Sequence, residues 1–490
     1  MMPVAQATLL SGEEPESFVT THPDAEAAFR ETLTLARRAP FYATHLAGVS
    51  VSGLGDLSRL PLTTKEHLRS ASPWGMIAVP REEVWHYHES TGTTGDPIAC
   101  WYRTGEFAAM GQAVARWLPE LVRGKIVLNR FPSFAPISFC FESAIQLSGG
   151  CHIPSGNLSW DVPFPRALDF LRTLRPQILA GLPLETFMLW ELASKLGIDP
   201  TRELDSLETA ILAGAPLPPT MRRMIERDWK VKVREIYGSN ETLFLGASCE
   251  QGTLHLETSL FIAEVLDPAT LAPVKPGAPG ILTMTHLGPK AMPLVRYFTR
   301  DVVRRVPCVC GRPEPAVELL GRQDDIVEYG SRRLYTTEIL EAGYALADRN
   351  RSRIFFAVIQ PSGLLYRVEV ESPRAGIDPA TVAAASEALG VPVQAEACRR
   401  GDLLDPTAFM RTPKVYKPGQ ISDWRGDGKK ALNIMEALLQ WPTFDLRTTL
   451  TVLGRVLRMN RRRRQLLRQQ ASRGASHGAS VQPIRWTSYR

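Results

Sequence analysis

The chain has 490 residues, 44% of them hydrophobic and 22% charged, which is typical of a globular protein large enough for two or three domains. Its formal charge of +6 comes from the C-terminal end of the chain. Residues 446–490 hold 11 of the 57 Lys and Arg residues and no Asp or Glu. The rest of the chain therefore carries 46 basic against 51 acidic side chains. This mildly acidic body excludes nucleic-acid binding as a property of the whole protein.

The N-terminal segment and the cysteines indicate the compartment. Residues 1–17 contain three glutamates and lack a basic start followed by an apolar run, so they do not resemble a signal peptide. No apolar stretch approaches the ~18 residues that a membrane span needs. Seven cysteines are too few, and odd in number, for a disulfide framework. We therefore expect a cytoplasmic protein without a transmembrane segment.

The first half of the chain alternates helical and extended patterns. A helix is predicted over residues 23–37, ending at residues 39–42, and Thr63 or Thr64 can cap a further helix. Beyond these, the predicted strands are residues 125–129, 177–180, 209–213 and 231–237, and the predicted helices are residues 164–174, 184–196 and 219–228. Such alternation predicts an α/β fold with a mostly parallel, helix-covered sheet and ligand loops at the carboxyl ends of its strands.

The pattern of predicted elements changes twice in the second half of the chain. Residues 260–265, 280–285 and 301–306 are predicted as strands of a more antiparallel region, and residues 353–360, 364–371, 379–389 and 391–397 as a small α+β unit with one helix. We predict a large N-terminal domain (residues 1–322), a small mobile α+β domain (residues 323–428) and a basic helical or disordered tail (residues 429–490).

One loop is rich in hydroxyl groups and glycine. It contains, in order, Ser90, Thr91, Gly92, Thr93, Thr94 and Gly95. Glycines let backbone N–H groups approach an anion, and hydroxyls donate to phosphate oxygens without adding charge. The loop predicts a site for a nucleotide polyphosphate, although an ordinary Gly/Thr-rich surface turn is the alternative.

Three further loops follow predicted strands. Gly214, Ala215 and Pro216 can offer flat backbone surface to a planar base, or form an ordinary turn. Tyr237 and Gly238 precede Glu241, whose carboxylate is suited to Mg²⁺. The third loop ends in Asp301, which can accept hydrogen bonds from ribose hydroxyls.

The order of these motifs resembles the adenylate-forming superfamily of acyl-CoA synthetases. A closer resemblance, to the phenylacetate:CoA ligase branch, covers roughly residues 25–425. The segments that carry it are Ala39-Pro40-Phe41-Tyr42, Leu60-Pro61-Leu62-Thr63-Thr64-Lys65, Ala78-Val79-Pro80, His88-x-Ser90-x-Gly92-Thr93-Thr94-Gly95 and Met292-Pro293-Leu294-Val295-Arg296-Tyr297.

The resemblance implies a reaction. Such enzymes use a carboxylate to attack the α-phosphate of ATP, form an acyl adenylate and pyrophosphate, and transfer the acyl group to a thiol. We expect ATP, Mg²⁺ and CoA as ligands, with an aromatic acid as the substrate. Delivery to an acyl carrier protein or an amine is one alternative, and a degenerate nucleotide-binding accessory protein is another. A homodimer is left open.

The resemblance also implies residue roles in the large, adenylating domain and beyond it. The loop from Ser90 to Gly95 would hold pyrophosphate, and Gly214, Ala215, Pro216 and Tyr237 would frame adenine. Glu241 would bind Mg²⁺ and Asp301 the ribose. Arg322 would lie near the ribose, and Asp324 would be the hinge of the small domain.

A mobile lysine near the end of the small domain is also implied, and it would stabilise charge during adenylation. Counting back from Asp423 and Arg425 favours Lys417, with Lys414 second. Both lysines being solvated, without a catalytic role, is the alternative.

Two departures from the family pattern stand out. Asp96 occupies a loop position where the family usually has lysine. Backbone and hydroxyl contacts can suffice for the phosphates, and lowered ATP affinity or altered chemistry is the alternative. In place of a glycine-rich segment, residues 131–141 contain four phenylalanines, which can line an acid-binding pocket or belong to the core. These are Phe131, Phe134, Phe139 and Phe141.

Four metal-ligating side chains form two pairs in the sequence. Cys249 precedes His255, and Cys308 precedes Cys310 in a turn closed by Gly311. Three thiolates and one imidazole make a closed, structural Zn²⁺ site, and the resemblance implies that some relatives carry one. Buried thiols with a surface histidine are the alternative.

The tail extends beyond the family pattern. Residues 435–439 and 446–467 are predicted as amphipathic helices, and Arg461, Arg462, Arg463 and Arg464 form a dense positive face. We expect a solvated or disordered appendage. Docking onto an acidic carrier protein, an anionic membrane surface or RNA is the alternative.

Overall fold

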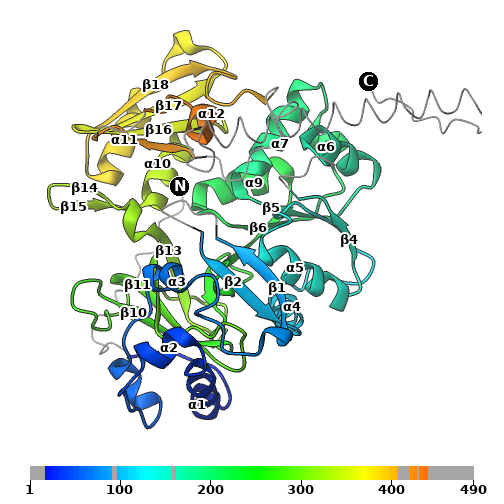
Figure 1. Cartoon of the computed structure of the whole chain (residues 1–490). Coiled ribbons are helices and arrows are strands. Elements are labelled where there is room, and N and C mark those ends of the chain that lie inside the picture. Colours follow the sequence, from blue (N-terminus) through cyan, green and yellow to red (C-terminus); the bar gives the residue numbers. More distant parts are fainter. Residues whose placement is uncertain (1–16, 91–96, 157–161, 407–418, 427–429, 440–490) are drawn as a thin grey trace, which may run out of the picture. The chain divides into compact units, whose positions relative to one another are not determined.

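The computed structural model describes residues 17–90, 97–156, 162–406, 419–426 and 430–439 (Figure 1). The chain forms two compact units, Met1–Gln440 and Trp441–Arg490. The second unit, with the helix predicted at residues 446–467, lies outside the described residues. The domain boundaries predicted after residues 322 and 428 stay predictions.

A single mixed sheet of eleven strands organises most of the first unit, in the order β10-β11-β12-β13-β9-β8-β7-β6-β5-β3-β4. The strands from β4 to β7 are parallel, and those from β8 to β10 pair antiparallel. The predicted parallel and antiparallel regions are therefore parts of one continuous sheet.

The parallel strands are β3 (Ile126–Asn129), β4 (Cys151–Pro154), β5 (Ile178–Gly181), β6 (Thr209–Ala213) and β7 (Lys232–Ser239). The antiparallel strands are β8 (Leu243–Ser248), β9 (Leu254–Leu256), β10 (Phe261–Leu266), β11 (Pro279–His286), β12 (Tyr297–Arg305) and β13 (Ala316–Arg322).

Helices cover both faces of the parallel strands (Figure 1). Successive residues of one strand point to opposite faces, and Ile211 and Leu212 of β6 accordingly belong to separate hydrophobic clusters. The first cluster contains helices α4 (Glu106–Trp117) and α5 (Pro136–Leu147). The second contains α6 (Phe164–Thr173), α7 (Pro183–Lys195) and α9 (Pro219–Trp229), and the short helix α8 (Pro200–Glu203) lies between α7 and α9 in the chain. The predicted helix-covered sheet is confirmed.

Short elements precede the sheet. Helix α1 (Ala25–Ala36) is followed by α2 (Pro40–His45), so the segment predicted only to end the first helix begins a second one, with Pro40 in the favoured first position. Thr64 caps α3 (Lys65–Ala71), as predicted. Strands β1 (Val84–Glu89) and β2 (Ala99–Arg103) form a separate antiparallel hairpin. Short 3₁₀ helices occupy Leu54–Arg59 and Arg81–Glu83.

The C-terminal part of this unit contains a four-stranded sheet in the order β18-β17-β16-β19. Its predicted strands and its helix α11 (Pro379–Leu389) are confirmed. The strands are β16 (Phe355–Gln360), β17 (Gly363–Val370), β18 (Val393–Arg399) and β19 (Ile421–Asp423). The other elements are the hairpin of β14 (Val327–Tyr329) and β15 (Arg332–Leu334), helices α10 (Thr336–Arg349) and α12 (Ile434–Leu439), and 3₁₀ turns at Gln323–Asp325 and Pro373–Ala375. Within the described ranges, no helix combines the length and apolar character needed to cross a membrane.

Candidate active site

Two buried carboxylates are held by two buried tyrosines near the middle of the large sheet. The Tyr297 hydroxyl donates to Glu241 Oε1 over 2.8 Å, and the Tyr237 hydroxyl donates to Asp301 Oδ2 over 2.7 Å. All four side chains are buried. Both acids predicted as ligand-binding residues are therefore oriented inside one polar cluster.

A sharp connection between β7 and β8 places Glu241 in this cluster. The pairing of these strands shifts register between Tyr237 and Gly238. A Cβ atom at position 238 would collide with the backbone oxygen of Leu243, so only glycine allows this close approach. Glycine is therefore required at position 238 by backbone packing, in a loop that the sequence predicted to bind a ligand.

Arg322 joins the same cluster from the neighbouring strand. Asp301 and Arg322 are register partners of β12 and β13, and Arg322 Nε lies 3.3 Å from Asp301 Oδ1. Asp301 in turn raises the pKa of the Arg322 guanidinium. Burial raises the pKa of Asp301 although Arg322 opposes this shift. Arg322 therefore lies beside the acid predicted to bind ribose.

The charge on Glu241 is favoured by its surroundings. Burial alone would raise the pKa of this carboxyl group, but Lys65, the backbone, Arg322 and the hydrogen bond from Tyr297 together bring the pKa below its usual value. A carboxylate that stays ionised while buried is a fitting oxygen ligand for a hard divalent cation.

The base of the predicted phosphate loop is tied to the Glu241 turn. The Ser90 N–H donates to the Ile98 carbonyl over 3.0 Å, and the Ile98 N–H donates to Ser90 Oγ over 2.9 Å. Asn240 Nδ2 donates to the carbonyl of Glu89 over 2.7 Å. Ser90 is therefore placed next to the turn that carries Glu241. The rest of the predicted loop, Thr91, Gly92, Thr93, Thr94, Gly95 and Asp96, lies outside the described residues.

The predicted adenine-framing turn follows β6, the parallel neighbour of β7. Gly214 has φ +82°, a conformation that favours glycine, and Ala215 is exposed. Because the carboxyl ends of parallel strands share one edge of the sheet, Gly214, Ala215 and Pro216 lie on the same edge as Tyr237.

Asp324, the predicted hinge, lies exposed in the 3₁₀ turn after β13. Arg300 of β12 pairs with Asp324 and also with Glu66 of α3, the second pair at 3.2 Å. The predicted catalytic lysine, Lys417, and its alternative Lys414 lie outside the described residues.

The four phenylalanines divide into two pairs. Phe131 and Phe141 are fully buried and meet edge to face with centroids 5.4 Å apart, so their interpretation as core is confirmed. The rings of Phe134 and Phe139 lie instead 5.5 and 5.4 Å from that of His88, whose Nδ1–H donates to the Phe134 carbonyl over 2.7 Å. The pocket-lining prediction therefore concerns only this second pair.

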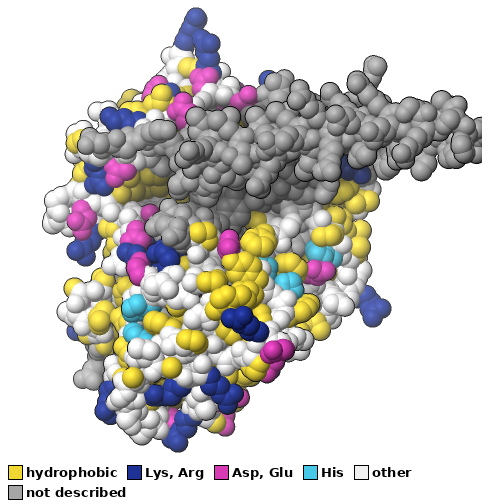
Figure 2. Space-filling view, in the orientation of Figure 1, with side chains coloured by type: hydrophobic (Ala, Val, Ile, Leu, Met, Phe, Trp, Pro, Cys, Tyr) yellow, Lys and Arg dark blue, Asp and Glu magenta, His cyan; other side chains and the backbone are white. Residues whose placement is uncertain are grey.

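The outer face of the β1–β2 hairpin presents exposed aromatic residues, and Figure 2 shows hydrophobic side chains gathered over this hairpin. Tyr87 and Trp85 are exposed, and Trp74 stacks on Trp101 with centroids 4.4 Å apart. No motif in the sequence indicated this patch, because its members come from three separate segments.

Lys65 is a site residue that the sequence did not identify. It begins α3, far from Glu241 in sequence, yet it lowers the pKa of Glu241 and opposes the burial shifts at Asp301 and Cys100. The signal was present in the Thr-Thr-Lys motif, which carried the family resemblance without a role being given to its lysine.

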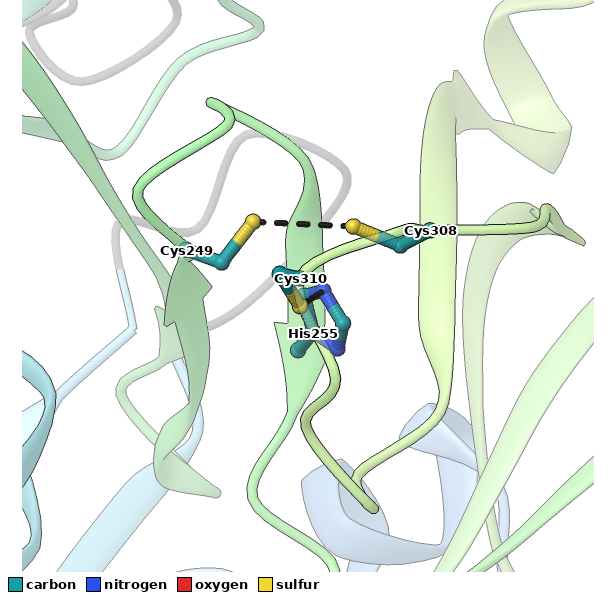
Figure 3. A group of neighbouring side chains, drawn as sticks. All are labelled: Cys249, His255, Cys308 and Cys310. Atoms are coloured by element: carbon teal, nitrogen blue, oxygen red, sulfur yellow. Dashed lines mark hydrogen bonds between the residues drawn. The ribbon is translucent and has the colours of Figure 1, made fainter.

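The predicted metal ligands form one cluster (Figure 3). Cys249 follows β8, His255 lies on β9, and Cys308 and Cys310 follow β12; their ligand atoms all lie within 4.8 Å of one another. The sulfurs of Cys249 and Cys308 are 3.7 Å apart, and Cys310 Sγ is 3.3 Å from His255 Nε2. A tetrahedral ion with ~2.3 Å sulfur and ~2.05 Å nitrogen bonds separates such atoms by about 3.8 and 3.6 Å. The group therefore has the size of a closed tetrahedral site.

Comparison with known proteins identifies the family. Residues 90–292 match the AMP-binding enzyme family. The chain is 34% identical over 323 residues to a phenylacetate-coenzyme A ligase of Thermus thermophilus, covering 62% of this chain and 70% of the relative. The chain belongs to the phenylacetate-CoA ligase branch of the AMP-binding, adenylate-forming enzymes.

Other comparisons agree with this family. A phenylacetate-coenzyme A ligase of Pseudomonas putida is 29% identical over 329 residues, covering 65% of this chain and 72% of the relative. A crystal structure of 2-hydroxyisobutyryl-CoA ligase in the postadenylation state, in complex with R3-HIB-AMP, has 22% sequence identity and a TM-score of 0.70, covering 82% of this chain and 90% of its own. The predicted fold class is thereby confirmed.

Proposed function

We propose that this protein uses ATP to activate a carboxylic acid as an acyl adenylate and then forms the CoA thioester. The observation that carries the proposal is the pair of buried carboxylates Glu241 and Asp301, with Arg322 paired to Asp301, beside the base of the Ser90 loop in a chain of the adenylate-forming family. The group offers one ionised carboxylate for a cation and a second, held by Tyr237, for ribose hydroxyls.

Bonds exchange in two steps. In the first, a carboxylate oxygen of the acid bonds to the α-phosphorus of ATP while the bond to pyrophosphate breaks. In the second, the CoA sulfur bonds to the acyl carbon, AMP leaves with the bonding electrons, and the thiol proton passes to solvent. Both steps require stabilisation of charge on phosphate oxygens more than a covalent protein nucleophile.

Glu241 fits Mg²⁺ in its donor type and charge. A single protein carboxylate with substrate phosphates and waters completing the shell is the usual arrangement for this ion. Bound there, Mg²⁺ would neutralise charge on the ATP phosphates. We assign ribose binding to Asp301, with Arg322 beside it, and adenine binding to Tyr237 and the turn of Gly214, Ala215 and Pro216.

The acid is proposed to be aromatic. The curated relatives are named phenylacetate-CoA ligases, and the rings of Phe134 and Phe139 lie against His88, two residues before Ser90. An aryl acid packed on such rings would gain both burial and edge-to-face contacts. Phe134 is 59% exposed, so it can cover a bound ligand.

Pyrophosphate release from ATP across a panel of aryl and alkyl acids tests this function. We expect release that depends on an aryl acid and on Mg²⁺. Absence of acid-dependent release with every acid would favour an accessory nucleotide-binding protein. Adding CoA, an acyl carrier protein or amines in turn then identifies the acyl acceptor, and we expect thioester formation with CoA.

We also propose that Cys249, His255, Cys308 and Cys310 hold a structural Zn²⁺. His255 Nδ1 donates to the Glu314 carbonyl over 2.7 Å, which leaves Nε2 facing the sulfur of Cys310. Such a hydrogen bond on the remote nitrogen fixes the tautomer of metal-binding histidines. The four ligands leave no open position, so the ion would brace two loops rather than take part in catalysis.

Metal analysis checks the zinc site. The purified protein should contain about one zinc per chain, and replacement of both Cys308 and Cys310 by serine should reduce this content to near zero and lower the melting temperature. Cys151→Ser removes an exposed thiol outside the cluster and should change neither quantity. A wild-type content far below one zinc per chain would contradict the assignment.

A further inference from the structure

Left-handed backbone occurs repeatedly beside the polar cluster of the two buried carboxylates. Among the described residues, seven that are not glycine have positive φ, and three of them adjoin the cluster in the chain. Arg296 (φ +44°) precedes Tyr297, and Arg300 (φ +67°) precedes Asp301. The third, Leu243 (φ +61°), belongs to the turn between β7 and β8. A residue with a side chain keeps this conformation only where its surroundings impose it.

Buried side chains from other segments hold the backbone at positions 295 and 296. The Val295 N–H donates to the Tyr42 hydroxyl over 2.9 Å, and the Val295 carbonyl accepts from Thr63 Oγ1 over 2.7 Å. The Arg296 N–H donates to Thr285 Oγ1 over 2.9 Å, and the Arg296 carbonyl accepts from the Thr63 N–H over 3.0 Å. Both residues therefore have all their backbone hydrogen-bonding groups occupied.

The Arg296 side chain is fixed as firmly as its backbone. Its Nε and Nη2 donate to the two carboxylate oxygens of Glu264 on β10 over 3.0 and 2.8 Å. Its Nη1 donates to the carbonyls of Ser58 and Leu60 over 2.9 and 2.7 Å. Arg296 and Glu264 are both buried. Only the planar fork of a guanidinium can make these four hydrogen bonds together, so the left-handed backbone cannot relax by moving the side chain.

The strand that follows Arg296 carries one of the cluster tyrosines. Tyr297 is the first residue of β12, and its hydroxyl donates to Glu241 Oε1 over 2.8 Å. The backbone conformation at the start of a strand sets the face to which its first side chain points. A relaxed backbone at Arg296 would therefore turn the Tyr297 ring away from Glu241.

We propose that Arg296 is a positioning residue, whose locked left-handed backbone aims the Tyr297 hydroxyl at Glu241. Through this hydrogen bond it sets the orientation of the carboxylate that we assign to Mg²⁺. The inference rests on the proposed function, because it concerns how that cation site is held in place.

Equilibrium binding of ATP to the full-length protein, measured without acid while Mg²⁺ is titrated, tests the proposal. Arg296→Lys keeps the charge beside Glu264 but not the four hydrogen bonds. It should raise the Mg²⁺ concentration for half-maximal ATP binding by about three- to tenfold, as should Tyr297→Phe. The double variant should need no more Mg²⁺ than Tyr297→Phe alone, because both changes act through one hydrogen bond.

Arg222→Lys is the control for loss of a partly buried arginine. Arg222 on α9 donates to the Val233 carbonyl over 2.7 Å and pairs with Glu235 at 3.5 Å. This change should leave the Mg²⁺ requirement as in the wild type. An unchanged requirement in Arg296→Lys would overturn the proposal. Effects of Arg296→Lys and Tyr297→Phe that multiply in the double variant would overturn it as well, because they would show that Arg296 supports the fold independently of Tyr297.

Thr285 provides the test if Arg296→Lys fails to fold. Thr285→Val removes the hydroxyl that accepts from the Arg296 N–H and should raise the Mg²⁺ requirement in the same direction, whereas Thr285→Ser should restore it. Equal requirements in both variants would contradict the proposal. Mg²⁺-dependent ATP binding without acid-dependent pyrophosphate release would refute the proposed function only, since this comparison needs no acid.

Discussion

We expect Glu241→Gln to lower the rate of acid-dependent pyrophosphate release by about 10²- to 10³-fold without unfolding the protein. The amide can still accept the hydrogen bond from Tyr297 but cannot supply the negative charge that a divalent cation needs. Because the pKa of Glu241 lies below its usual value, the wild-type carboxylate is ionised throughout about pH 6–8, and the difference should persist over that range.

Tyr297→Phe is the matched control for this change. It removes the hydrogen bond to Glu241 and keeps the charge, so its effect should be smaller, about tenfold or less. Rates measured at increasing Mg²⁺ should show a raised requirement in Glu241→Gln. A variant with wild-type rate and wild-type Mg²⁺ dependence would remove Glu241 from the cation site.

Replacing Lys417 with alanine should lower adenylation by about 10²- to 10³-fold and leave thioester formation from a supplied acyl adenylate nearly unchanged. The reason is chemical: only the first step develops charge between the α-phosphate and the departing pyrophosphate. Separate measurement of the two half-reactions checks this expectation.

Lys414→Ala is the paired variant, since it removes the same charge three residues away. It should retain adenylation within a few fold. If Lys414→Ala is inactive and Lys417→Ala is active, the two assignments exchange. If both variants are fully active, the lysines are solvated and charge is stabilised elsewhere.

Regular elements with strong local patterns were predictable from the sequence. Strand β6 and helix α11 have the predicted bounds, because a short apolar run and a capped amphipathic segment are local signals. Helices α4, α5 and α10 were not predicted. Their placement depends on packing against elements distant in sequence, as for α4 and α5 against β8 and for α10 against α9. That the parallel and antiparallel regions share one sheet is also a tertiary property.

Site residues that belong to short continuous sequence motifs were predictable from the sequence. Glu241, Asp301 and Arg322 lie together as the family resemblance implied. Lys65 was missed because its neighbourhood arises from the bridge between Thr63 and Tyr297, which joins segments 234 residues apart in the chain. The phenylalanine segment was ambiguous for a similar reason, since a helix such as α5 turns some of its side chains into the core and others away.

The hydrogen bonds from Tyr237 and Tyr297 orient Asp301 and Glu241 in the folded protein before any ligand binds. Burial and the neighbouring acids raise the pKa of Tyr237 and Tyr297 well above the usual value, so both hydroxyls are protonated donors at neutral pH. The side-chain conformational entropy of Asp301 and Glu241 is consequently lost during folding and not during ligand binding. A nucleotide arriving at this site would meet acceptors already oriented, and more of its contact energy would remain available as affinity.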